Sequence, residues 1–369
     1  MNNLYIVASV TLLSSAFIVT ILINKIRWIV KSMDLIDRPD HRSSHIESTP
    51  TMAGVSFFLT VIFVLIIIKP WDTTGVGINL IAALGLMFAV GLKDDLVVST
   101  PRAKIISEVL AIGMILFCNC LKVSSLGGFM GIGVIPDFAA YILVTLIILT
   151  IINSFNMIDG IDGLASIIGI VIFSVYGFLF LIFGLEFYFL LCLCFLGILI
   201  GYIRFNLSKN RKIFMGDTGS LFIGFCIGFL SVKFLSIDSK LFQEFSFIPS
   251  NKLIIIAAIF FIPLFDIIRV ISIRLINKNS PFKADNNHIH HVLINSGLSH
   301  FKASLFLGSL NLILASVFIF LSRSYGSFEM IGFYLLAFIL LLIVFYKLKR
   351  NIEKGNRFRY LVSAIQFLF

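Results

Sequence analysis

Long apolar runs alternate with short polar clusters along the whole chain. Each run has roughly the 20 residues that an α-helix needs to cross a membrane. Eleven such runs cover residues 4–24, 51–69, 76–92, 103–121, 138–153, 163–184, 187–203, 216–235, 253–273, 303–321 and 328–346. The pattern predicts an all-α protein, a polytopic integral membrane helical bundle of about 11 transmembrane helices, with residues 1–369 in a single transmembrane domain.

The distribution of Lys and Arg predicts the orientation of these spans. Most of the 29 basic residues fall in one alternate set of loops and in the C-terminal tail 347–369. Cytoplasmic loops carry an excess of Lys and Arg, so we expect this set of loops and the C-terminus in the cytoplasm, and the N-terminus outside. The first run has no basic segment before it and no small-residue cleavage site after it, which indicates an uncleaved helix.

The composition excludes a string of soluble domains. Hydrophobic residues make up 59% of the chain, charged residues 13%, and the mean hydropathy is +1.05, whereas soluble domains are about 25% charged. Nearly every polar cluster lies on the expected cytoplasmic side, which is typical of an enzyme that works at one membrane face. A transporter more often has polar groups near the bilayer midplane and inverted repeats, which inspection of the sequence does not find. The net charge of +10 follows from the loop bias and requires no nucleic acid partner.

Asp94 and Asp95 form the first candidate functional cluster, directly after the apolar run 76–92. Neighbouring carboxylates repel each other unless a cation or a proton relieves them, and a divalent metal or a diphosphate bound through one does so. The alternative is an ordinary helix end. The dipole of a helix disfavours acids at its C-terminus, so this alternative is the weaker one.

The stretch NSFNMIDGIDGLA, residues 153–165, places four polar side chains between two apolar runs. Asn153, Asn156, Asp159 and Asp162 step by three and share one broad face of a helix, while the glycines indicate a turn. Polar side chains near lipid are costly and are usually paired or functional. Because Mg²⁺ prefers oxygen ligands, cation binding is favoured over a plain helical hairpin.

Three further stretches are rich in polar residues. RFNLSKNRKIFMGDTGSLFIGF (204–225) puts Asp217 at the expected start of a helix, where it can cap the helix, lie beside a phosphate, or do both. SPFKADNNHIHHVLINSGLSH (280–300) contains His288, His290 and His291, which are half of the six histidines of the chain. It has no zinc-type spacing and suits phosphate or base recognition and proton shuttling. For DRPDHRSSH (37–45), the alternative to a functional role is a solvated basic loop.

Charged residues also occur inside the apolar runs. Asp266 and Arg269 are three residues apart in the run 253–273, so we expect a structural ion pair between them. Glu108, in the run 103–121, has no obvious local partner and is expected to face the interior of the bundle.

In chain order the motifs read D-x-P-x-x-R-x-x-H, TPTMAG, D-D, N-x-x-N-x-x-D-G-I-D-G-L, F-M-G-D-T-G-S and S-P-F-x-A-D-x-x-H-x-H-H. This order, from about residue 34 to residue 300, resembles the polyprenyl-phosphate N-acetylhexosamine-1-phosphate transferases. That superfamily includes the enzymes that start O-antigen, enterobacterial common antigen and teichoic acid synthesis, and the phospho-MurNAc-pentapeptide translocase. The last motif is typical of the GlcNAc-1-phosphate branch. Val98 departs from both branches, because the translocase branch often has Lys at this fifth position of D-D-x-x-K and the O-antigen and common-antigen enzymes often have Asp or Asn there.

The resemblance implies that a HexNAc-1-phosphate, most often GlcNAc-1-phosphate, moves from a UDP-sugar to undecaprenyl phosphate with release of UMP. It also implies an Mg²⁺ cofactor, for which Mn²⁺ can substitute. The partners are then UDP-HexNAc, undecaprenyl phosphate and the lipid bilayer, and the superfamily suggests a homodimer. The expected location is the inner (plasma) membrane of a bacterium, with a multi-pass chain and an active site that faces the cytoplasm.

The same resemblance implies roles for individual residues. The metal ligands are Asn156 and Asp217. The catalytic residues are Asp94 and Asp95 beside the lipid phosphate, Asp159 and Asp162 at the uridine diphosphate, and His291. The substrate-binding residues are Asp37, His45, Asn153, Asn206, Lys283, His288 and His290, of which the histidines belong to a loop that closes over the pyrophosphate and the sugar.

Phosphoryl transfer mostly requires positioning and charge neutralisation, which clustered metal ligands supply. We therefore favour direct in-line attack by the lipid phosphate over a covalent aspartyl-phosphate intermediate. The transferase reaction of peptidoglycan synthesis is the nearest alternative. A membrane prenyltransferase is disfavoured because it usually needs two D-x-x-x-D motifs. The motifs leave the identity of the sugar open.

Overall fold

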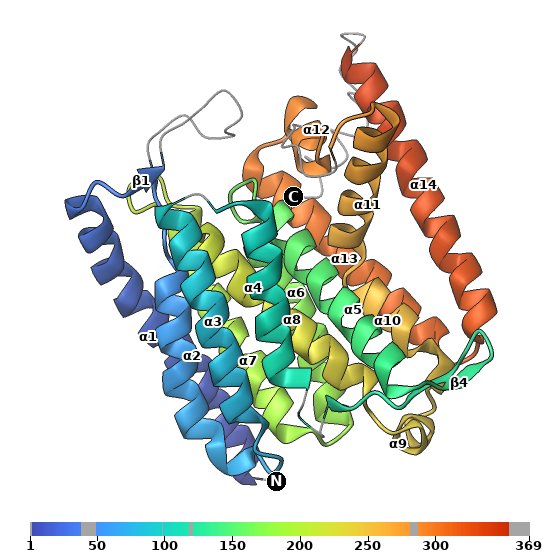
Figure 1. Ribbon diagram of the computed structural model, residues 1–369. Helices are drawn as coiled ribbons and strands as arrows, with labels where there is room; N and C mark the ends of the chain where they lie inside the picture. The colour runs from blue at the N-terminus through green and yellow to red at the C-terminus, as the bar shows by residue number, and fades with distance from the viewer. Residues whose placement is uncertain are drawn as a thin grey trace.

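The chain folds into a bundle of long helices with two small sheets in its connections (Figure 1). The computed structural model describes residues 2–37, 49–97, 99–116, 118, 121–280 and 287–353. The first elements are α1 (Asn2–Ser32), β1 (Ile36–Asp37), β2 (Thr49–Pro50), α2 (Gly54–Ile68), the 3₁₀ helix η1 (Lys69–Trp71), α3 (Val76–Leu96), α4 (Pro101–Leu116), β3 (Ser125–Phe129), β4 (Ile132–Val134) and α5 (Asp137–Ile158). They are followed by α6 (Leu164–Ile182), α7 (Glu186–Asn206), α8 (Gly216–Leu235), α9 (Ser239–Glu244), η3 (Pro249–Asn251), α10 (Lys252–Ile259), α11 (Phe261–Ile276), α12 (Ile289–Asn295), α13 (His300–Leu321) and α14 (Ser327–Glu353).

The expected helical membrane architecture is confirmed, with two corrections to the spans. Within the described ranges, nine helices are long and apolar enough to cross a membrane. The run 253–273 is not one straight helix, because α10 and α11 meet at a 72° bend. Pro263 lacks the N–H that would bond to the carbonyl of Ile259, so the helix breaks there. The run 103–121 forms only the 16-residue helix α4, which is shorter than a typical span.

Helix α8 is the centre of the bundle. Of its most apolar 18 residues 94% are buried, against 11% for α14 at the edge. Glycines let its neighbours approach closely. A Cβ on Gly219 would lie 3.3 Å from Gly54 Cα of α2, and one on Gly224 would lie 2.9 Å from Ile152 Cα of α5. Small residues at helix contacts are the usual way to pack helices in lipid, and here they hold the first turn of α8 against its neighbours.

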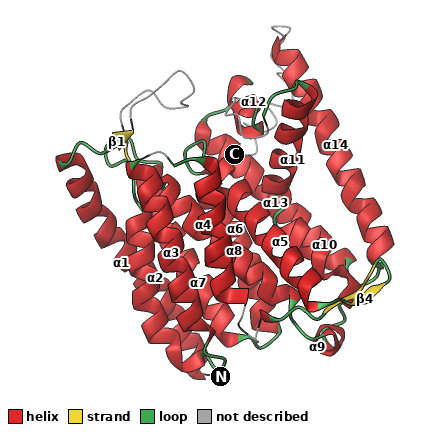
Figure 2. Cartoon of the chain, in the orientation of Figure 1, coloured by secondary structure: helices red, strands yellow, loops and turns green. Residues whose placement is uncertain are grey.

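The two ends of the bundle differ in character (Figure 2). The sheet β3–β4 lies at the end where α5 begins, and the sheet β1–β2 lies at the opposite end. There the backbone of β2 bonds to the segment before α8, since Phe214 N–H donates to the carbonyl of Pro50 at 2.8 Å. Helices α3, α5 and α7 end, and α4, α6 and α8 begin, at this same end. The polar motifs are therefore collected at one end of an apolar bundle.

Candidate active site

Lys104 of α4 lies at the centre of the polar cluster. Its Nζ is 3.3 Å from Asp94 Oδ2 of α3 and 3.2 Å from Asp217 Oδ2 of α8. The side-chain amide of Asn156, on α5, contacts both Lys104 and Asp217. Oriented so that its nitrogen donates to Asp217 Oδ1 at 2.8 Å, the amide accepts from Lys104 Nζ at 3.3 Å. Three helices thus direct oxygen atoms at one cation.

Asp95 has a different task from its neighbour Asp94. Its Oδ1 accepts from the backbone N–H of Asp217 at 2.8 Å, and its Oδ2 accepts from the N–H of Thr218 at 3.1 Å and from the Thr218 hydroxyl. Asp95 therefore caps the N-terminus of α8, where N–H groups have no helical partner. Gly216, with φ of +72°, permits the contact, because a Cβ there would lie 2.5 Å from Asp95 Oδ2. The capping role considered for Asp217 belongs to Asp95, and the Asp217 side chain contacts Lys104 and Asn156 instead.

Glu108 and Asn153 form a buried pair between α4 and α5. Glu108 Oε2 accepts from Asn153 Nδ2 at 2.9 Å, and Nδ2 also donates to the carbonyl of Leu149 at 2.9 Å. Glu108 is fully buried, so the expectation that it faces the interior is confirmed. Because both amide hydrogens of Asn153 are used, the amide oxygen is held on the side away from Glu108 as an acceptor.

Asp159 and Asp162 lie in the turn between α5 and α6, in opposite surroundings. Asp162 Oδ2 is 2.6 Å from Lys212 Nζ and 3.3 Å from His300 Nδ1. Burial alone would raise the pKa of Asp162, but His300 and Lys212 hold it below its usual value. Burial, and then repulsion by carboxylates of which Asp217 has the largest effect, raises the pKa of Asp159 to about 7. Asp159 therefore changes its protonation near neutral pH, whereas Asp162 stays ionised.

Asn206, the last residue of α7, fixes the same turn from the other side. Its Oδ1 accepts from Gly163 N–H at 2.6 Å and its Nδ2 donates to the Tyr202 hydroxyl at 2.9 Å. Gly163 has φ of +84°, which only glycine adopts easily. Asn206 is buried, and its amide oxygen and nitrogen both form hydrogen bonds within the protein. Its role as a substrate contact stays a prediction.

His290 lies against this turn, and the rings of His288 and His291 lie beside that of His290. A Cβ on Gly160 would be 2.5 Å from His290 Nε2, so the ring of His290 rests on a position that tolerates only glycine. The ring centroids of His290 and His291 are 4.4 Å apart. Burial lowers the pKa of His290 to about 3, so this ring is neutral at physiological pH.

Asp266 of α11 anchors the histidine segment. The expected ion pair is confirmed, with Arg269 Nη2 3.1 Å from Asp266 Oδ1. Asp266 also has partners far along the chain, because its Oδ2 lies 2.7 Å from His288 Nδ1 and its Oδ1 accepts from Ile289 N–H at 2.9 Å. An ion pair that is local in sequence therefore serves to dock a distant motif.

The structure brings most of the candidate residues to one end of the bundle. They are Asp94, Asp95, Asn153, Asn156, Asp159, Asp162, Asn206, Asp217, His288, His290 and His291. Asp37 ends β1, but its side chain, like the whole of His45, Val98 and Lys283, lies outside the described residues. The roles assigned to all of these residues stay predictions.

Sequence reasoning assigned no role to Lys104, Lys212 and His300, which pair with the motif carboxylates. The positive-inside bias already explained the excess of Lys and Arg in these loops, so the sequence contained no signal that singled out Lys104 or Lys212.

The side-chain oxygens around Lys104 can be compared with the ligands that a divalent cation requires. In the part of the chain that the structure describes, no three His, Cys, Asp or Glu side chains are arranged to hold a metal by themselves. Asn156 and Asp217 contact each other, and both already face a positive charge, the Lys104 ammonium. Mg²⁺ is usually held by one or two protein ligands and completes its shell with water and phosphate oxygens. An adjacent carboxamide and carboxylate fit that pattern.

Known proteins are similar in sequence to this chain over most of its length. The family model described as Glycosyl transferase family 4 matches residues 77–235. The chain is 30% identical over 336 residues to the undecaprenyl-phosphate alpha-N-acetylglucosaminyl 1-phosphate transferase of Salmonella typhi, which covers 89% of this chain and 88% of the relative. It is 29% identical over 339 residues to the protein of the same name from Escherichia coli O157:H7, covering 90% and 89%. A probable undecaprenyl-phosphate N-acetylglucosaminyl 1-phosphate transferase of Bacillus subtilis (strain 168) is 26% identical over 300 residues, covering 80% and 78%.

Proposed function

Because this chain belongs to glycosyl transferase family 4, we propose that it transfers N-acetylglucosamine 1-phosphate from UDP-N-acetylglucosamine to undecaprenyl phosphate and releases UMP. The observation that carries the proposal is the convergence of Asp94, Asn156 and Asp217 on one cation at one end of a membrane bundle. The names of the relatives support the choice of sugar and lipid. The product, a sugar linked to the lipid through a diphosphate, then starts a cell-surface glycan.

The reaction is an in-line displacement at phosphorus. An oxygen of the lipid phosphate forms a bond to the sugar-linked phosphorus of the nucleotide, and the bond from that phosphorus to the bridging oxygen breaks, so that UMP leaves. The second pKa of a phosphate monoester is about 6, so the attacking oxygen is largely ionised at neutral pH and needs little help from a base. Such a transfer depends mainly on positioning and on neutralising charge.

The residues of the cluster supply both requirements. Asn156 and Asp217 would hold Mg²⁺, or Mn²⁺, which neutralises charge on the two substrate phosphates when it is bound. Lys104 adds a second positive charge beside the phosphates, and Asp94 holds its ammonium in place. His290 and His291 close the site above the turn that carries Asp159, where they limit the access of water.

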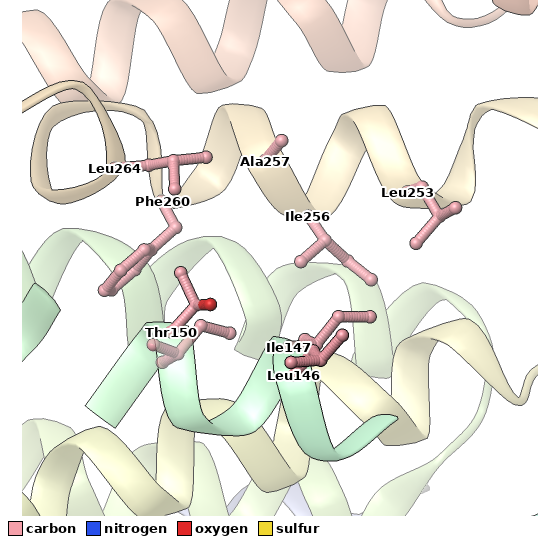
Figure 3. A pocket seen from close by; sticks show the side chains of 9 residues that line it. Leu146, Ile147, Thr150, Leu253, Ile256, Ala257, Phe260 and Leu264 are labelled. Atoms are coloured by element: carbon pink, nitrogen blue, oxygen red, sulfur yellow. The ribbon is translucent and has the colours of Figure 1, made fainter. Parts of the chain in front are cut away.

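A groove beside the cluster offers a place for the lipid chain (Figure 3). It has a volume of about 220 Å³ and lies between α5 and the α10–α11 break, lined by Leu146, Ile147, Thr150, Ile151, Leu253, Ile256, Ala257, Phe260 and Leu264. Leu146, Thr150 and Asn153 follow one another on a single face of α5. The groove therefore leads toward Asn153, which is about 5 Å further along the helix axis. An isoprenoid chain in the groove places its phosphate near the polar cluster.

UMP release tests the proposed reaction. Purified protein in lipid nanodiscs, given UDP-N-acetylglucosamine and undecaprenyl phosphate, is expected to release UMP in the presence of Mg²⁺ and to stop when EDTA is added. UDP-MurNAc-pentapeptide, offered as an alternative donor, is expected to react poorly. No UMP from any UDP-HexNAc would overturn the proposal, and preference for the pentapeptide donor would assign the chain to the peptidoglycan reaction.

We further propose that the chain lies in the inner membrane of a bacterium with this site in the cytoplasm. The proposal rests on the excess of Lys and Arg in the loops at the polar end. Green fluorescent protein fused to the C-terminus is expected to fluoresce, and alkaline phosphatase fused there is expected to be inactive. The opposite pair of results would reverse the orientation.

A further inference from the structure

The break between α10 and α11 leaves two backbone groups without helical partners. Pro263 has no N–H, so the carbonyl of Ile259, four residues earlier, loses its usual donor. Ile262 lies in the first turn of α11, where N–H groups have no acceptor within the helix. Both groups lie within an apolar run, where no water is at hand to satisfy them.

Asn311, on the neighbouring helix α13, satisfies both groups. Its Nδ2 donates to the Ile259 carbonyl at 2.9 Å, and its Oδ1 accepts from Ile262 N–H at 3.0 Å. The side chain is completely buried. Because one amide matches one donor and one acceptor, Asn311 holds α10 and α11 at a fixed distance from each other and from α13.

The backbone that Asn311 holds is also a wall of the apolar groove. Phe260 lies between Ile259 and Ile262, and its ring points toward Thr150 of α5 (Figure 3). Ile256 and Leu264 line the groove on either side of the break. The 72° bend makes the axes of α10 and α11 diverge at this point. A change in the bend would therefore move the side chains that give the groove its shape.

We propose that Asn311 is a positioning residue for the lipid substrate, because it holds the break that shapes the groove for the isoprenoid chain. This inference rests on the proposed function. Asn311 takes no part in the chemical step, since its carboxamide is occupied by the backbone of Ile259 and Ile262. It acts on the binding of a long acceptor chain and leaves the binding of the nucleotide sugar unchanged.

The substitution Asn311→Leu tests this role, because leucine has the same branched side-chain shape and makes neither hydrogen bond. The KM for undecaprenyl phosphate is expected to rise about tenfold, while kcat and the KM for UDP-N-acetylglucosamine stay within about twofold of the wild type. Geranyl phosphate, whose two isoprene units do not fill the groove, is expected to react equally well with both proteins. Asn311→Asp keeps an acceptor for Ile262 N–H, and we expect a KM between those of the wild type and Asn311→Leu.

Tyr176→Phe is the matched control, since it removes one buried hydrogen bond, of 2.7 Å to Ser231, between α6 and α8. Tyr176→Phe is expected to leave KM and kcat unchanged for both undecaprenyl phosphate and geranyl phosphate. Equal loss with the long and the short acceptor, or an unchanged KM for undecaprenyl phosphate, would overturn the inference. If Asn311→Leu does not accumulate in membranes, undecaprenyl phosphate and geranyl phosphate are compared with Asn311→Asp instead. A wild-type protein that releases no UMP with either acceptor would instead overturn the proposed function.

Discussion

Two pairs of aspartates lie at the ends of α3 and α5, and the two members of each pair have different contacts and roles. At the end of α3, Asp95 caps α8 while Asp94 contacts the ammonium of Lys104. After α5, Asp162 pairs with two basic side chains while Asp159 lies among other carboxylates. Asp94 and Asp162 each have a cation beside them, whereas burial and neighbouring carboxylates raise the pKa of Asp159 to about 7. Membership of a motif therefore does not decide what an acid does, whereas its neighbours do.

Asp217 is the residue that both pairs share, and Asp217→Ala is expected to have the largest effect. The backbone N–H of Asp217 donates to Asp95, and the Asp217 side chain contacts Lys104 and Asn156. The backbone cap survives the substitution, so the protein is expected to fold. We expect UMP release to fall about a thousandfold, because a charge that stabilises the transition state is lost. Electron paramagnetic resonance of bound Mn²⁺ is expected to show weaker binding.

Asp137→Asn is the control for this substitution, because Asp137 pairs with Lys122 on the exposed surface at the opposite end of the bundle. It is expected to retain wild-type activity and Mn²⁺ binding. Unchanged Mn²⁺ affinity in Asp217→Ala would remove Asp217 from the metal site.

The division of work within the first pair predicts different consequences for two neighbouring substitutions. Asp94→Asn is expected to lower kcat/KM about a hundredfold with little change in Tm, since it removes the charge that positions Lys104. Asp95→Ala is expected to destabilise the protein by about 1–2 kcal/mol, the usual cost of a lost helix cap. Thermal unfolding and UMP release, measured on both proteins, separate the two roles. Identical profiles for the two variants would contradict the division.

The second pair predicts a smaller effect at Asp162. Its contact with Lys212 is partly buried, at 2.6 Å, so the two side chains are expected to be coupled by about 1 kcal/mol. A double-mutant cycle of Asp162→Asn and Lys212→Met, followed by chemical unfolding, measures this coupling. Additive effects of the two substitutions would show that the pair does not stabilise the turn.

The second pair also predicts a pH dependence of stability, carried by Asp159. Its pKa is about 7 in the folded protein and about 3.8 in the unfolded chain, so the folded state binds the proton more tightly. Its contribution to stability is complete below about pH 4 and is lost as the pH rises through 7. With EDTA present, the Tm of the wild type is expected to fall between pH 5 and pH 8 more steeply than that of Asp159→Asn. Parallel curves for the two proteins would show that Asp159 does not titrate in this range.

Some of the tertiary arrangement had signals in the sequence, and some had none. Pro263 inside the run 253–273 is a signal for a break, because proline cannot donate to the carbonyl four residues earlier, although the predicted span treated this run as one helix. Nothing in the sequence indicated that Asn311, in a different apolar run, would satisfy the groups that the break exposes. A single asparagine among apolar residues has too many candidate partners for its spacing to select one.

The sequence by itself determined the membrane-spanning architecture, the motifs and their order, and the local pair of Asp266 and Arg269. These features depend on the hydropathy of neighbouring residues or on a spacing of three along one helix, and both are properties of short stretches. Tertiary structure alone decided that Asp95 caps α8 by accepting from the N–H of Asp217, 122 residues later, and that Lys104 is the cation between Asp94 and Asp217. The reason is physical, because such contacts depend on which helix faces approach and how closely. In this protein the glycines of α8 set that approach, and their effect appears only when the helices pack.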